Sequence, residues 1–179
     1  LFFIGTTNIT AQAGGESHPP PGFKAPPKVS FDGIPESASI RPELQGKPHQ
    51  VHARLMADKL TVQQGETFRL GLHLEQDKDW HTYWLSPGDV GKPTEIEWKL
   101  PEGVSASKYE YPAPHYFDLQ GVVSIGYDAE AFLFSEITVP ADLPLGKTDF
   151  AADARWLVCK TSCIPGSVSL SLPLEIVAN

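Results

Sequence analysis

Two cysteines, Cys159 and Cys163, are the residues of this 179-residue chain whose type and spacing could do chemistry. Because the chain has no other thiol, they can bond to each other, bind a metal or stay reduced. A disulfide that closes so short a loop restrains the unfolded chain by roughly 2 kcal/mol, against about 4.7 kcal/mol for a hundred-residue loop. Closely spaced cysteines are more often reactive, because each thiol can attack a disulfide that involves the other. The spacing therefore favours a redox pair, and a chemically inert disulfide is the alternative.

Binding of Cu(I) is a further alternative, because thiolates are soft ligands that could act together with a distant histidine. No histidine has tight ligand spacing to the cysteines, and the chain's one methionine is Met56; the histidines are His18, His49, His52, His73, His81 and His115. The chain contains no Gly-x-Ser-x-Gly elbow, no His-Glu-x-x-His motif and no glycine-rich phosphate loop. We therefore expect no metal and no cofactor, and neither hydrolase nor nucleotide chemistry.

The charge balance narrows the class of partner. Acidic residues outnumber basic ones by 22 to 14, which gives a formal net charge of −8. Such a surface disfavours nucleic acid and anionic lipid, and it suits contact with other proteins. No run of 18 or more apolar residues is present, so we expect no membrane span in this segment.

The composition divides the chain into three parts. Residues 1–13 are apolar and then small and polar, ending in Ala-Gln-Ala, which is typical of a signal-peptide remnant and predicts export to an oxidising compartment. Residues 14–48 are rich in proline, and we expect an extended, disordered linker. The folded domain is then expected over residues 49–179.

Alternation of apolar and polar residues predicts an all-β domain. The clearest runs are residues 66–75, 95–100 and 167–176, where every second side chain is apolar. In the run around Phe132 and Phe134 the alternation slips, which predicts a β-bulge at Ser135-Glu136. Pro173 predicts an edge position or a bulge in the last strand. Many short strands without helices indicate an immunoglobulin-like antiparallel β-sandwich.

The strand pattern also places the cysteine pair. Along residues 148–158 the apolar side chains alternate up to Trp156 and Val158, so Cys159 falls at a strand end and the pair lies on a hairpin end. Trp156 and Ile164 are expected to shield the sulfurs in part. Apolar cover disfavours a thiolate, whereas the positive charge of Lys160 favours it.

Several motifs, taken together and in order, resemble the periplasmic N-terminal domain of the thiol:disulfide interchange protein DsbD and its relative ScsB. The resemblance covers about residues 49–177. The motifs that carry it are Trp80-His81-Thr82-Tyr83-Trp84, Pro87-Gly88-Asp89, Gly91-Lys92-Pro93-Thr94, Trp98-Lys99-Leu100-Pro101-Glu102-Gly103, Tyr111-Pro112-Ala113-Pro114, Gly126-Tyr127, Trp156-Leu157-Val158-Cys159 and Cys163-Ile164-Pro165.

The resemblance implies a function and a location. In that family the domain accepts electrons from a thioredoxin-like domain of the same protein and passes them to periplasmic disulfide isomerases or other thioredoxin-fold proteins. It implies that Cys163 forms the mixed disulfide with each partner and that Cys159 resolves it. The expected activity is that of a periplasmic protein-disulfide reductase domain. Whether a transmembrane domain follows in the intact protein stays open.

The family also has a cap loop whose aromatic residue covers the disulfide until a partner moves it aside. The resemblance places this cap at Tyr116 or Phe117, and the alternative is that both simply fill the end of the sandwich. It further places Tyr83 and Asp118 near the pair. Here three residues separate the cysteines, whereas five do so in the best-known member, which moves the resemblance toward ScsB.

Overall fold

The structure is a computed structural model that describes residues 34–119 and 121–179. The signal-peptide remnant expected over residues 1–13, and the linker expected from residue 14 up to residue 33, lie outside the described residues. Within them the elements in chain order are η1 (Glu36–Ala38), β1 (Ser39–Ile40), β2 (Glu43–Leu44), β3 (Lys47–Pro48), β4 (Val51–Ala57), β5 (Thr61–Gln63), β6 (Thr67–Gln76), β7 (Thr82–Gly88), β8 (Glu95–Lys99), β9 (Ser105–Ala106), β10 (His115–Leu119), β11 (Val122–Tyr127), β12 (Glu130–Thr138), β13 (Gly146–Cys159) and β14 (Cys163–Val177). In this part of the chain no helix is long and apolar enough to cross a membrane.

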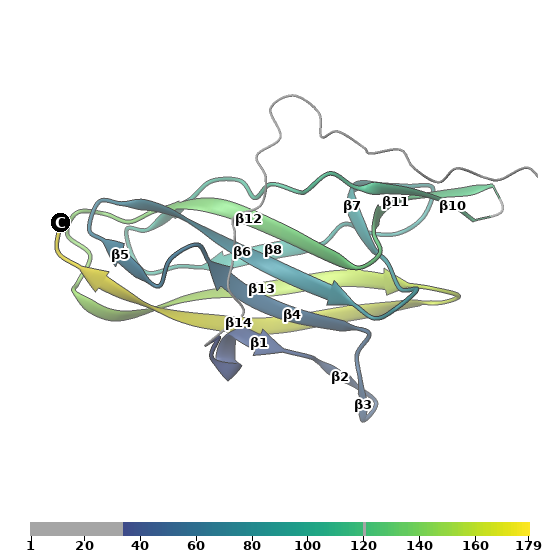
Figure 1. Cartoon of the computed structure of the whole chain (residues 1–179), viewed down its shortest axis with the longest axis horizontal. Helices are drawn as coiled ribbons and strands as arrows, with labels where there is room; N and C mark the ends of the chain where they lie inside the picture. The colour runs from purple at the N-terminus through teal and green to yellow at the C-terminus, as the bar shows by residue number, and fades with distance from the viewer. Residues whose placement is uncertain (1–33, 120) are drawn as a thin grey trace, which may run out of the picture.

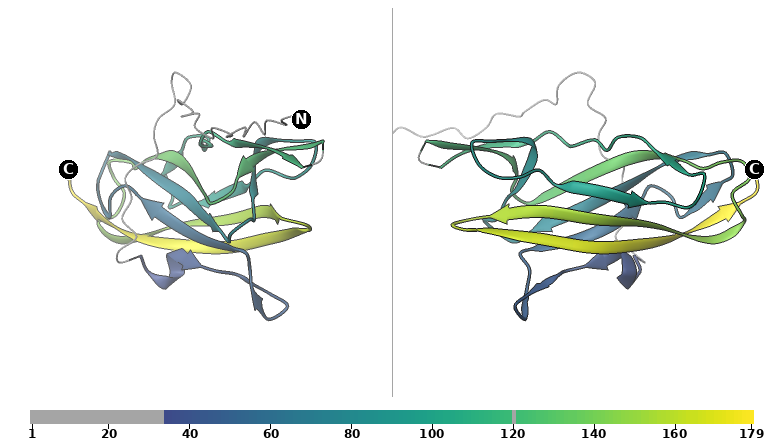
Figure 2. Two further views of the ribbon diagram at one scale, coloured as in Figure 1. Left: turned by 45° about the vertical axis from the view of Figure 1, so that its right-hand side comes forward. Right: turned by 180° about the vertical axis from the view of Figure 1, so that it is seen from behind.

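Two main sheets form the body of the molecule (Figure 1). One has the strand order β1-β4-β6-β12-β9 and the other the order β5-β14-β13-β8. Neighbouring strands are antiparallel except for the short β5, which runs parallel to β14. The three-stranded sheet β10-β11-β7 extends from one end of this body, the end at which the turn between β13 and β14 also lies (Figure 2). The architecture is the immunoglobulin-like antiparallel β-sandwich that the sequence predicted.

The core lies between the two main sheets and follows the alternation in the sequence. Along β6 the side chains of Phe68, Leu70, Leu72 and Leu74 are all buried in one hydrophobic cluster. The rings of Phe68 and Phe150 meet edge to face with their centroids 5.4 Å apart, and this contact joins β6 of one sheet to β13 of the other.

The bulge predicted in β12 is wrong. The strand pairs with β6 from Glu130 to Thr138 in an unbroken register. The inward positions are the odd-numbered ones, including Ser135, whose hydroxyl accepts a hydrogen bond of 2.9 Å from the indole N–H of Trp98. Phe132 and Phe134 therefore lie on the outer face, where the guanidinium of Arg69 stands 5.1 Å from the Phe134 ring centroid. The alternation in the sequence slips because two large aromatic side chains lie on the outer face of the sheet and a serine lies on the inner face.

The folded domain begins before His49, because residues 34–42 pack onto the sandwich, whereas residues 43–48 form the exposed β2–β3 hairpin. Strand β1 pairs with β4, and the side chain of Ala38 is fully buried in the core cluster. The prolines of this segment interrupt regular strands without preventing burial, which explains why composition assigned the segment to a linker.

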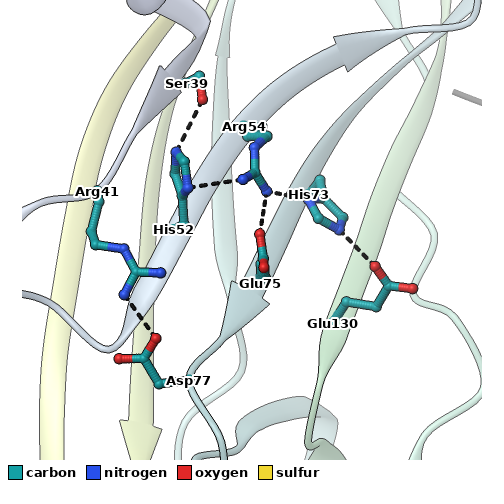
Figure 3. Close-up of polar contacts among 8 residues, drawn as sticks. All are labelled: Ser39, Arg41, His52, Arg54, His73, Glu75, Asp77 and Glu130. Carbon is teal, nitrogen blue, oxygen red and sulfur yellow. Dashed lines mark hydrogen bonds and ion pairs between the residues drawn. The ribbon is translucent and has the colours of Figure 1, made fainter. Parts of the chain in front are cut away.

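Polar side chains on the outer face of the sheet hold the same segment in place (Figure 3). The Arg41 guanidinium donates to the Asp77 carboxylate at 2.8 Å, and Ser39 Oγ lies 3.0 Å from His52 Nε2. Arg54 donates to His52 Nδ1 at 2.9 Å, so this nitrogen is an acceptor and the His52 ring is neutral. Burial and the neighbouring Arg54 hold the pKa of His52 below its ordinary value, in agreement with this arrangement.

A substitution in this segment can test whether it is packed on the domain or is a linker. Ala38→Asp places a carboxylate at a position with no exposed surface, and we expect it to lower the free energy of unfolding by about 3 kcal/mol or more. The matched control is Leu44→Asp in the exposed β2, which we expect to change stability by less than about 0.5 kcal/mol. Urea denaturation at neutral pH measures both. Equal, small effects would show that residues 34–42 do not belong to the fold.

Candidate functional site

The two cysteines lie at the end of the long β13–β14 hairpin. Strand β13 pairs with β14 along its whole length, from Gly146 opposite Ile176 to Cys159 opposite Cys163. The sulfurs are joined in a disulfide, with the Cα atoms 4.1 Å apart. The hairpin tip is far from the C-terminus, at the end of the molecule where the β10–β11 hairpin projects (Figures 1 and 2).

The two cysteines differ in exposure. Cys159 is buried, with 4% of its surface accessible, whereas Cys163 is exposed. Cys159 is also held by His81, the residue before β7: the Cys159 N–H donates to the His81 carbonyl at 2.9 Å, and the Cys159 carbonyl accepts from the His81 N–H at 3.0 Å. Of the two cysteines, Cys163 is therefore the one that an incoming thiolate can approach more easily.

Tyr83 is brought to the pair as the resemblance implied. Its hydroxyl lies 3.9 Å from Cys163 Sγ, and because a disulfide sulfur carries no proton, the hydroxyl is the donor of this contact. The side chain is buried, and burial raises the pKa of Tyr83 above its ordinary value. The hydroxyl thus stays protonated at neutral pH. The ring packs so closely on Gly91 that a Cβ there would come within 2.2 Å of it.

The two aromatic residues in the expected cap lie differently on β10. Phe117 is partly buried, and its ring centroid is 5.2 Å from that of His81, with an angle of 30° between the ring planes. Tyr116 is 65% exposed, since successive side chains on a strand face opposite ways. Asp118 accepts a hydrogen bond of 2.8 Å from the Gly121 N–H in the turn that follows, and its carboxylate makes no hydrogen bond to the cysteine hairpin within the described residues.

Trp156 and Lys160 contact other residues than the sulfurs. Trp156 is buried opposite Gly166, where a Cβ would come within 2.4 Å of the indole, and its ring meets that of His49 with centroids 5.7 Å apart. The ammonium of Lys160 pairs with the Asp79 carboxylate at 3.0 Å. Shielding of the sulfurs by Trp156 stays a prediction, and the charge of Lys160 is partly compensated by Asp79.

His81 is the neighbour of the pair that the sequence argument missed. It contacts Cys159 through its main chain and both Tyr83 and Phe117 through its ring. The sequence contained the information needed to find His81, because His81 and Tyr83 are two positions apart in an extended segment and their side chains therefore lie on the same face. Elsewhere, no three or more His, Cys, Asp or Glu side chains come together as a metal site in residues 34–119 and 121–179.

An all-β domain that carries a disulfide at the exposed end of a hairpin belongs to the class of disulfide-bearing sandwich modules. The family comparison is more specific. A family model described as the N-terminal domain of the thiol:disulfide interchange protein DsbD matches residues 50–175, and the chain belongs to this family. It is therefore a thiol:disulfide interchange domain with a cysteine pair.

Solved structures include relatives of this domain. The N-terminal periplasmic domain of ScsB from Proteus mirabilis is 26% identical, with a TM-score of 0.52, over 69% of this chain and 46% of that one. The chain thus spans about half the length of that relative. The reduced DsbD N-terminal domain of Neisseria meningitidis is 10% identical over 59% of this chain and 75% of that one, with a TM-score of 0.37. No curated protein matches the chain.

The difference in exposure predicts unequal alkylation of the reduced protein. We expect iodoacetamide to label Cys163 at least about tenfold faster than Cys159, because the reagent reaches only an accessible thiolate. Mass spectrometry of peptides over a time course of labelling measures the two rates. The same reaction in concentrated urea is the control, in which both thiols should react alike. Equal rates in the folded protein would contradict the asymmetry.

Proposed function

We propose that this chain is a periplasmic protein-disulfide reductase module. Its cysteine pair takes up two electrons from a thioredoxin-like domain and passes them to thioredoxin-fold acceptors such as disulfide isomerases. The observation that supports this most directly is the disulfide between the exposed Cys163 and the buried Cys159. The periplasmic location is supported by the likeness to the ScsB domain, which is described as periplasmic, and by the persistence of disulfides in that compartment.

Uptake of electrons begins at Cys163. A thiolate of the reduced donor attacks Cys163 Sγ in line with the disulfide, so that a bond forms between the two proteins and Cys159 leaves as a thiolate. The second thiolate of the donor then attacks the donor sulfur of this mixed disulfide. The donor is oxidised to a disulfide, Cys163 is released as a thiolate, and the pair has gained two electrons. Both thiolates take up a proton to the extent that the pH allows.

Transfer to the acceptor reverses these steps. The Cys163 thiolate attacks the acceptor's disulfide, which forms a mixed disulfide and releases one acceptor thiolate. Cys159 then attacks Cys163 Sγ, re-forms the intramolecular disulfide and releases the second acceptor thiolate. The acceptor has gained two electrons. The fixed pairing of Cys159 opposite Cys163 keeps the resolving sulfur next to its target through both exchanges.

Tyr83 has a positioning role in this proposal. Its protonated hydroxyl, 3.9 Å from Cys163 Sγ, can donate to the negative charge that develops on this sulfur whenever Cys163 is the leaving group or the nucleophile. Burial prevents the hydroxyl from ionising and repelling that charge. This assigns the stabilised thiolate to Cys163, the sulfur that a partner can reach.

Phe117 is the cap residue in this proposal. It lies on the ring of His81, next to Tyr83 and to the strand that holds Cys159, whereas Tyr116 is largely exposed. Phe117 could screen the pair from small thiols, and a docking partner would displace it. The β10–β11 hairpin projects at the same end of the molecule as the cysteine turn, so one partner can contact both (Figure 1).

Trapping of a mixed disulfide tests the exchange. Cys159→Ala removes the resolving sulfur, and we expect this variant to form a stable covalent adduct with a thioredoxin-fold partner through Cys163. Cys163→Ala is the matched control and should form little adduct, because Cys159 is buried. Non-reducing electrophoresis and mass spectrometry identify the adduct. The absence of an adduct, together with a reduction potential below about −300 mV, would instead mark an inert structural disulfide.

Removal of the cap side chain tests its assignment. We expect Phe117→Ala to raise the rate at which dithiothreitol reduces the disulfide by about threefold or more, because the screening ring is lost. Tyr116→Ala, on the opposite face of the same strand, is the control and should stay close to the unsubstituted protein. The measurement is the time course of reduction, followed by mass spectrometry of alkylated thiols. If Tyr116→Ala alone accelerated the reduction, Tyr116 rather than Phe117 would be the cap residue.

A further inference from the structure

His81 connects the cysteine pair to the proposed cap. Its main chain makes two hydrogen bonds with that of Cys159, of 3.0 and 2.9 Å. Its ring stands 5.2 Å from the ring of Phe117 on β10 and 5.2 Å from that of Tyr83 on β7, measured between centroids. The residue itself is 8% exposed. One residue thus holds the buried cysteine by its backbone and the cap aromatic by its side chain.

The ring of His81 is poorly prepared to carry a charge in this position. Within the described residues its nitrogens make no hydrogen bond, and its ring neighbours are the aromatic rings of Phe117 and Tyr83. With 8% of the residue exposed, an imidazolium here would have little water and no acceptor among the described residues, so the closed arrangement favours the neutral ring.

The acidic and basic groups around His81 come from three directions. Asp128, in the turn between β11 and β12, attracts a proton on His81, but its carboxylate is already 2.8 Å from Nδ1 of His115. His115, on β10, also touches Phe117, with ring centroids 6.4 Å apart. Lys160 and Asp79, beyond Cys159, form an ion pair with each other. None of these groups replaces the solvent that a charged His81 would need.

We propose that His81 is the positioning residue that couples the cap to the cysteine pair, and that its protonation opens the cap and increases access to Cys163. This inference rests on the proposed function. It adds a control by pH that acts through a residue whose side chain makes no hydrogen bond to either sulfur within the described residues. Phe117 on a neutral His81 is the closed state, and Phe117 displaced from a hydrated, charged His81 is the open state.

The sign of the pH effect follows from linkage. Burial lowers the pKa of His81 in the closed state, and Asp128 opposes this only in part. In the open state the ring is hydrated, and its pKa returns toward the ordinary value of about 6.5. The open state therefore binds the proton more tightly, so a fall in pH below about 6.5 shifts the population toward it, whereas above that pH the closed state is fully favoured.

The test measures the rate at which dithiothreitol reduces the disulfide of the full chain at about pH 7.5 and at about pH 5. At each pH this rate is divided by the rate at which dithiothreitol reduces oxidised glutathione. The division cancels the change in the thiolate fraction of the reductant. We expect the ratio to rise by about twofold or more on acidification, because the open population rises. His81→Phe keeps an aromatic ring but cannot titrate, and we expect its ratio not to change with pH.

Two further variants separate the coupling from other causes. His115→Gln removes the second titrating ring near Phe117 and should keep the rise, whereas Phe117→Ala keeps His81 but has no cap to open and should lose it. A rise that persists in His81→Phe or in Phe117→Ala, or that disappears in His115→Gln, would overturn the proposal. So would a ratio that does not change in the unsubstituted protein. Failure to trap any partner with Cys159→Ala would instead contradict the proposed function itself.

Discussion

The unbroken antiparallel register between β13 and β14 determines where both sulfurs lie. The paired strands run past the core, where the ring of Phe150 meets that of Phe68 in the facing sheet, and the pairing continues until Cys159 lies opposite Cys163. Because main-chain bonds and core packing fix every pair in this ladder, the geometry at its end does not depend on loop conformation. Alternation along β13 then buries Val158 in the core, and His81, just before β7, pairs with Cys159 through two main-chain hydrogen bonds.

Around this fixed pair the structure places a layer of side chains that comes from other strands. The Tyr83 hydroxyl from β7 lies 3.9 Å from Cys163 Sγ, and the ring of Phe117 from β10 lies against that of His81. The charged groups pair with each other at the margin, as Lys160 does with Asp79 and His115 with Asp128. The immediate surroundings of the pair are therefore aromatic and nearly free of charge, which makes a single proton on His81 costly there.

The sequence allowed the sandwich, the hairpin end and the contact of Tyr83 to be predicted, because each depends on local alternation or on a motif. It failed where one residue's burial is decided by a distant partner. Phe134 is buried on the outer face of its sheet, where Arg69 lies over its ring, and the segment that contains β1 joins the fold because β1 pairs with the edge of β4. Likewise, the contact that distinguishes Phe117 from Tyr116 is with His81, thirty-six positions away from Phe117 in the chain, which no local pattern reveals.

A redox module must keep its shape when its disulfide opens, and the energetics of this hairpin allow that. The five-residue ring closed by Cys159 and Cys163 restrains the unfolded chain by roughly 2 kcal/mol, which is a modest share of the stability of a domain. The ladder bonds of β13, the two bonds between Cys159 and His81, and the core beneath Val158 do not pass through the sulfurs. Reduction therefore removes one covalent bond from an arrangement that other interactions maintain. The disulfide adds little stability, and it can open without disturbing the fold, for the same reason: it closes a short ring at the end of an already paired hairpin.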